Sequence, residues 1–269
     1  MSLLVQYSDS DLDEKQESPE PPIKKQKKNA LPPLPDFLEN LFPDKRKSTE
    51  STDHQGRVRS IPHKEGDWAT FVFIKIPVSN EIRKWLGVLE RQSNKIYCQE
   101  NKSGDLSKTY IQSCISVSKP YLSLSLSRTV YLKWAHIERF KIMLAESIQS
   151  SKSFDLSFSG LVTFENEEKT RSFLSLDVHP NSLGPPALHS LLNKVDAVMK
   201  KLQLSTFYQP PKFHVSLLWT TPPEKLTEAL CQRIQADHPE LLLELAEFEI
   251  PVGQVSCKIG KRMVGFPLK

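Results

Sequence analysis

Hydrophobic and polar positions along the chain follow two spacings from about residue 56 onward. Runs rich in β-branched and aromatic residues predict strands at 68–76, 121–127, 156–164, 172–178, 213–219, 245–251 and 254–259. Apolar residues at helical spacing predict helices at 81–91, 134–148, 187–202 and 223–236. Strand, helix, strand, strand and then a similar series indicate an α+β architecture built from two related halves.

Residues 1–55 have a different composition. The acidic, serine-rich opening (Ser8–Glu14) leads into a proline-rich stretch and then the basic run Lys24-Lys25-Gln26-Lys27-Lys28. This segment has too little apolar surface to offset its ordering entropy, so we predict a disordered tail before a folded domain at 56–269. The basic run is typical of a nuclear localisation signal or a nucleic-acid-binding tail, and a solvated charge run explains it equally well. Residues 34–42 could form one short apolar-faced helix that docks on the domain.

Composition adds few constraints. The chain has 269 residues, 38% of them hydrophobic and 25% charged, which is typical of a globular protein. It contains no apolar run of membrane-spanning length and no secretory signal pattern, so we expect no membrane association. Four cysteines without a C-x-x-C pair indicate reduced thiols, not a metal site or a disulfide framework. The net charge of +4 permits an anionic partner without requiring one.

The run Phe213-His214-Val215-Ser216-Leu217 carries the candidate chemistry. In a strand, His214 and Ser216 point to one face, where an imidazole can move a proton and a hydroxyl can donate to a phosphate oxygen. About ninety residues earlier, 122–127 repeats the same alternation with serines and no histidine. Cleavage of RNA by its own 2′-hydroxyl needs a general base, a general acid and donors to the phosphate oxygens. Two such strands facing one another would supply all three, although a single His-x-Ser is a weak signal.

The sequence around His214, from Ser205 to Trp219, resembles the U6 small nuclear RNA phosphodiesterase family, a branch of the 2H phosphoesterases. The resemblance extends to 56–63 and 66–70 at the start of the domain, to 168–173, and to 255–260 and 266–268 at its end. It implies two pseudo-symmetric β/α lobes whose antiparallel sheets face a central cleft. It also implies a nuclear 3′-to-5′ exoribonuclease that trims the uridine-rich 3′ tail of U6 small nuclear RNA. Members need no metal or other cofactor and leave a cyclic or terminal phosphate, and we expect a monomer that binds a single-stranded RNA 3′ end.

The resemblance also assigns roles to individual residues. His214 and Ser123 take the two catalytic positions. The expected substrate-binding residues are Ser125, Ser216, Tyr208, Lys212, Phe213, Val215 and Phe164. Tyr208 matches an aromatic that stacks on a base, whereas Phe164 is explained equally well as a hairpin core residue. Candidates to attract the RNA backbone are Lys169, Arg171, Lys212 and Lys258.

The chain departs from the family at the first motif, which reads His-Leu-Ser-Leu-Ser. Counting back from Arg128-Thr129-Val130 puts Ser123 in the histidine position, whereas counting forward from Lys119 puts Leu122 there. Neither side chain can take up and release a proton near pH 7 as an imidazole does, and His136 is a poor substitute a dozen residues on. Three interpretations stay open: an RNA phosphodiesterase, a catalytically impaired RNA-binding homologue, and a different 2H activity such as cyclic-nucleotide hydrolysis.

Overall fold

The computed structural model describes residues 64–100, 110–116, 119–246 and 248–269. The predicted tail at 1–55 and the predicted short helix at 34–42 lie outside these residues. The helices are α2 (Asn80–Glu100), α3 (Trp134–Ile148), α4 (Gly184–Lys201), α5 (Glu228–Asp237) and α6 (Pro239–Ala246). The strands are β1 (Asp67–Pro77), β2 (Gln112–Ser113), β3 (Tyr121–Ser125), β4 (Val130–Lys133), β5 (Phe154–Leu156), β6 (Phe158–Glu165), β7 (Ser172–Val178), β8 (His214–Thr220), β9 (Ile250–Val252), β10 (Gln254–Ile259) and β11 (Arg262–Pro267).

Most of the predicted elements are present. Three of them, α3, β7 and β10, have the predicted bounds, whereas α2 continues nine residues beyond Arg91. The strand predicted at 245–251 is largely wrong, because α6 includes Leu245 and only Ile250 and Pro251 lie in β9. Leu241 and Leu245 are buried at a helical spacing of four, and a second helix is what brings both into the core. The short strands β2 and β4 and the last strand β11 were not predicted.

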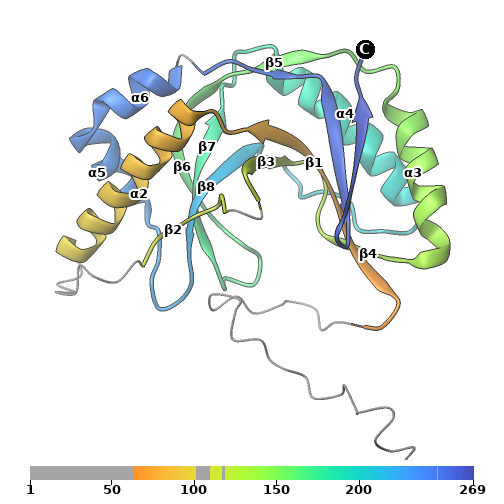
Figure 1. The fold of residues 1–269 in the computed structure, drawn as a ribbon, viewed down its shortest axis with the longest axis horizontal. Helices are drawn as coiled ribbons and strands as arrows, with labels where there is room; N and C mark the ends of the chain where they lie inside the picture. Colours follow the sequence, from red (N-terminus) through yellow and green to blue (C-terminus); the bar gives the residue numbers. More distant parts are fainter. Residues whose placement is uncertain (1–63, 101–109, 117–118, 247) are drawn as a thin grey trace, which may run out of the picture. The chain divides into compact units, whose positions relative to one another are not determined.

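The antiparallel sheet joins the two lobes. Its order is β11-β10-β1-β3-β8-β7-β6, with β2 paired to β8 and β4 paired to β1, while β5 and β9 form a separate two-stranded sheet. The predicted α+β architecture of two lobes is confirmed. The lobes meet where β3 pairs with β8 through one register pair, Leu124 and Val215. Figure 1 shows α3 and α4 beside the β1–β10–β11 end of the sheet, and α2, α5 and α6 beside the β6–β7–β8 end.

Along β3, successive side chains point alternately into the core and onto the opposite face of the sheet. Leu122 and Leu124 are buried among the core residues, whereas Ser123 and Ser125 keep partial exposure on the opposite face. Strand β8 does the same at its start, with Val215 fully buried between the partly exposed His214 and Ser216. Burial of the apolar set on one face therefore fixes which side chains the two central strands present on the other.

Two expectations from composition concern other parts of the chain. The four cysteines are free thiols, as predicted. Burial raises the pKa of Cys231 and of Cys257 to about 12, so both thiols stay protonated at neutral pH. Within the part of the chain that the structure describes, no helix has the length and apolar character needed to cross a bilayer.

Candidate active site where the lobes meet

A cavity of about 230 Å³ lies over the junction of β3 and β8. It is lined by Cys114, Lys119, Ser123, Ser125, Arg171, Phe173, His214, Ser216 and Trp219. The two serines of the first motif and the histidine and serine of the second therefore line one cavity. Of the described residues that line it, His214 is the only histidine, and His136 lies exposed on α3.

The register of the central strands defines the place of the missing histidine. In antiparallel strands, the residue before Leu124 lies beside the residue after Val215, so Ser123 neighbours Ser216 and Ser125 neighbours His214. Ser123 therefore occupies in β3 the position that His214 occupies in β8. The alternative count, which placed Leu122 there, is wrong because that side chain is 2% exposed and faces the core.

His214 is held as a neutral base. Its Nδ1 lies 3.0 Å from the carbonyl oxygen of Lys212, and since a carbonyl can only accept, Nδ1 carries the hydrogen. The Phe164 ring stacks on the imidazole with 3.9 Å between ring centroids. Burial lowers the pKa of His214, although the hydrogen bond to Lys212 and the charge of Asp177 act in the opposite direction. At neutral pH the Nε2 atom therefore has a free lone pair and can accept a proton.

The serines of the two strands have different neighbours. Ser175 on β7 donates to Ser216 Oγ across 3.4 Å, which orients that hydroxyl. The Lys119 ammonium donates to Ser123 Oγ, also at 3.4 Å. These hydroxyls are able to donate to the non-bridging oxygens of a bound phosphate.

Arg171 is the cation of this site that the sequence identified only as a general RNA attractant. Its side chain lines the cavity, and its Nε is buried without a hydrogen-bond partner among the described residues. A guanidinium with a buried, unsatisfied Nε donor suits an anionic ligand, because a phosphate oxygen would supply the missing acceptor. The other proposed attractants, Lys169, Lys212 and Lys258, do not line the cavity.

Of the remaining residues predicted to bind substrate, some have exposed side chains and others have buried ones. Tyr208 lies outside the cavity lining with 40% of its surface exposed, and the Arg128 guanidinium covers one face of its ring at 4.0 Å. A base that stacks on Tyr208 must use the other face or displace Arg128. The side chains of Phe213 and Val215 pack in the core, 7% and 0% exposed, so a ligand can reach only their backbone. Phe164 contacts His214, so its position favours a role in holding the imidazole over a core-only role.

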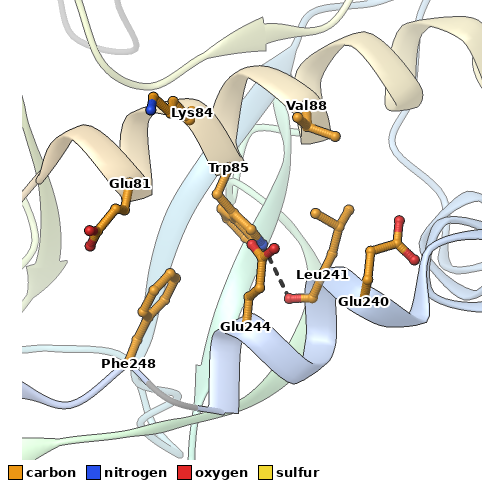
Figure 2. Close-up of a pocket in the computed structure, with 8 residues that line it drawn as sticks. All are labelled: Glu81, Lys84, Trp85, Val88, Glu240, Leu241, Glu244 and Phe248. Carbon is orange, nitrogen blue, oxygen red and sulfur yellow. Dashed lines mark hydrogen bonds between the residues drawn. The ribbon is translucent and has the colours of Figure 1, made fainter.

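A second, larger pocket of about 530 Å³ lies between α2 and α6, away from this site. Figure 2 shows its apolar floor of Trp85, Val88, Leu241 and Phe248. The Trp85 Nε1 donates to the carbonyl oxygen of Leu241 at 3.1 Å, which ties the two helices together. None of the residues that the sequence assigned to chemistry lines this pocket.

No three histidine, cysteine or acidic side chains come together as a metal site within the described ranges.

Residues 32–267 match the family model HVSL, described as an uncharacterised conserved protein, and those four letters are also His214 to Leu217 here. The chain is 32% identical to U6 snRNA phosphodiesterase 1 of Rattus norvegicus over 90% of this chain and 86% of that protein. The Xenopus laevis protein of the same name is 31% identical, over 98% of this chain and 99% of the relative. The chain belongs to the U6 snRNA phosphodiesterase family.

Solved structures agree with this family at the level of the fold. Usb1 of Kluyveromyces marxianus superposes with a TM-score of 0.52 at 15% identity, covering 74% of this chain and 98% of that one. The same protein with uridine monophosphate gives a TM-score of 0.54 at 16% identity, with the same coverage. The chain therefore shares the fold of Usb1, in agreement with the family that the sequence relatives show.

Proposed function

We propose that this chain is an RNA 3′-end phosphodiesterase that trims the uridine-rich tail of U6 small nuclear RNA. The observation that carries the proposal is the cavity in which His214 and Ser216 face Ser123 and Ser125 about the Leu124–Val215 pair. Support for the substrate comes from the relatives named U6 snRNA phosphodiesterase 1 and from the Usb1 structure with uridine monophosphate.

In the proposed reaction His214 acts as the general base. Its Nε2 takes the proton of the penultimate ribose 2′-hydroxyl, whose oxygen then forms a bond to the adjacent phosphorus. The bond from phosphorus to the 5′-oxygen of the last nucleoside breaks, and that oxygen must receive a proton. The shortened RNA ends in a 2′,3′-cyclic phosphate, which water can open to a terminal phosphate. Ser125, Ser216 and Arg171 stabilise the charge on the non-bridging oxygens.

The test is cleavage of a 3′-uridylated RNA oligonucleotide in EDTA. We expect slow cleavage by the wild-type chain. The Ser123→His variant should be faster, and the usual contribution of one positioned acid or base, about 10²–10⁴-fold, is the upper limit of the gain. His214→Ala should abolish cleavage while RNA binding persists. Unchanged cleavage by His214→Ala would remove this residue from the mechanism.

A second function, binding of an RNA 3′ end without turnover, is favoured by one observation: Ser123 stands in the position equivalent to His214. The same assay separates the two functions. RNA binding without cleavage by the wild-type chain, together with cleavage by Ser123→His, would establish the binding protein.

The location and assembly of the chain belong to the same proposal. A protein that processes a spliceosomal RNA would act in the nucleus, and the basic run Lys24-Lys25-Gln26-Lys27-Lys28 is the candidate signal. Changing its four lysines to glutamine should move a fluorescent fusion into the cytoplasm, and unchanged nuclear fluorescence would refute the signal. We further propose a monomer, which light scattering of the purified chain tests directly.

A further inference from the structure

Lys119 lies where the first motif lacks its histidine. Two backbone hydrogen bonds hold Lys119 beside Ser116, from the Ser116 N–H to the Lys119 carbonyl and from the Lys119 N–H to the Ser116 carbonyl, both 3.0 Å. Its ammonium reaches Ser123 Oγ at 3.4 Å and stands 5.7 Å from the centre of the Tyr121 ring. A cation is therefore held against the one hydroxyl that replaces the imidazole.

We infer that Lys119 and Ser123 together act as the general acid of this site, in place of the histidine of the first motif. The inference rests on the proposed phosphodiesterase function. Ser123 Oγ–H gives its proton to the departing 5′-oxygen as the bond from phosphorus to that oxygen breaks. Lys119 Nζ–H gives a proton to Ser123 Oγ at the same time. After one turnover Lys119 is neutral and His214 is protonated, and exchange with water restores both.

The two ends of the site have the protonation states that this reaction needs. His214 is neutral with its Nε2 lone pair free, and a lysine ammonium holds its proton at neutral pH. In a regular antiparallel pair, diagonal residues such as His214 and Ser123 are separated by about 7–8 Å, which leaves room for one phosphate between base and acid. Such spacing is compatible with acid and base on opposite sides of the phosphorus.

The neighbouring cations suit this role less well. Arg171 faces the cavity, but a guanidinium does not release its proton in proteins, so it can bind a phosphate without acting as an acid. Lys75 pairs with Ser123 across β1 and β3, but its side chain is exposed and lies outside the cavity lining, 4.9 Å from the Tyr121 ring centre. Lys75 therefore offers a matched control that removes an equal charge from the same surroundings.

The experiment compares two substrates that differ in their need for an acid. The 3′-uridylated RNA must protonate an alkoxide leaving group, whereas uridine 3′-(4-nitrophenyl phosphate) releases a phenolate that needs no proton. Lys119→Met and Lys119→Arg should each lose at least about 10²-fold in kcat on RNA, the usual scale for one acid, and less than tenfold on the nitrophenyl ester. Lys75→Met should stay within about threefold of wild type on both, since an exposed charge contributes little.

A second background tests the replacement directly. In Ser123→His, the new imidazole can supply the proton, so adding Lys119→Met should change kcat on RNA by less than tenfold. Thermal unfolding of each variant monitors folding, and Lys119 is half-buried and outside the hydrophobic core, so these changes should be tolerated.

The outcomes separate the two proposals. Wild-type activity in Lys119→Arg, or equal losses on both substrates, would show that the charge binds phosphate without donating a proton, and would overturn the inference. Cleavage of RNA by Ser123→His but not by the wild-type chain would overturn it as well. Failure of both chains to cleave RNA would instead refute the phosphodiesterase function itself.

Discussion

Truncating Leu124 to alanine tests whether the contact between β3 and β8 positions the site. Leu124 is fully buried, and it forms with Val215 the register pair that joins β3 to β8. The change removes three carbons, which at about 0.8 kcal/mol per buried methylene is worth about 2.4 kcal/mol. The cavity left behind raises the loss to about 3–4 kcal/mol, within the range measured for buried leucines.

Two measurements on the same protein check this expectation. At roughly 2–4 °C per kcal/mol for a domain of this size, the midpoint of thermal unfolding should fall by about 10 °C. Binding of a fluorescent, uridine-ended RNA with a 2′-deoxy penultimate residue, which cannot be cleaved, should weaken as well. Ser123 and Ser125 flank Leu124, so a shift of β3 displaces both hydroxyls together.

The control is Leu144→Ala in α3. Leu144 is equally buried, so its truncation should cost a similar free energy, but the residue lies in the helix layer and does not touch the cavity. RNA affinity should therefore be unchanged in this variant. Equal loss of affinity in the two variants, or a loss of stability below about 1 kcal/mol in Leu124→Ala, would refute the argument that this pair sets the site.

Three further substitutions test single contacts. Phe164→Ala should expose the imidazole of His214 and raise its pKa toward the ordinary value. Because only the neutral imidazole acts as a base, the acidic limb of the profile of kcat/KM against pH should shift to higher pH. An acidic limb at the same pH as in wild type would contradict this. Tyr208→Ala should weaken binding of a uridine-ended RNA by about 1–3 kcal/mol in a titration, and no loss would exclude stacking. Gly260→Ala should lower the urea midpoint, because a left-handed backbone costs other residues about 1–2 kcal/mol. Gly260 has a φ of +56°, and an added Cβ would lie 2.8 Å from the Trp68 ring; an unchanged midpoint would show that the ring moves aside.

The central strands of the site could be predicted from alternation alone. The pattern around His214 and around Ser123 repeats every second residue, and burial of the intervening residues fixes the face on which each lies. The bulge further along β8 could not be predicted. Regular alternation would put Leu218 on the face of His214 and Ser216, but the register against β7 shifts between Leu174 and Ser175. Trp219 therefore lines the cavity and Leu218 is buried.

The sequence also did not predict which lobe each helix packs against. A chain of two similar halves suggests that each half keeps its own helix. Instead α2, from the first half, packs beside α5 and α6 of the second, as the hydrogen bond from Trp85 to Leu241 shows. The sequence contains the apolar stripe of each helix, but nothing in the stripe specifies which lobe it covers.

The loss of one histidine does not affect the two ends of the site equally. A half-buried imidazole such as His214, whose Nδ1–H donates to a carbonyl, is suited to accept a proton at Nε2. A serine hydroxyl alone could not replace it, because it is too weak a base. The position that changed is the other one, where the reaction requires a proton donor. A hydroxyl in contact with an ammonium can supply a proton, although less well than an imidazolium because its acid strength is poorly matched to neutral pH. Of the two histidine positions, the surrounding residues can therefore partly compensate only for loss of the one that Ser123 occupies. The compensating group is Lys119.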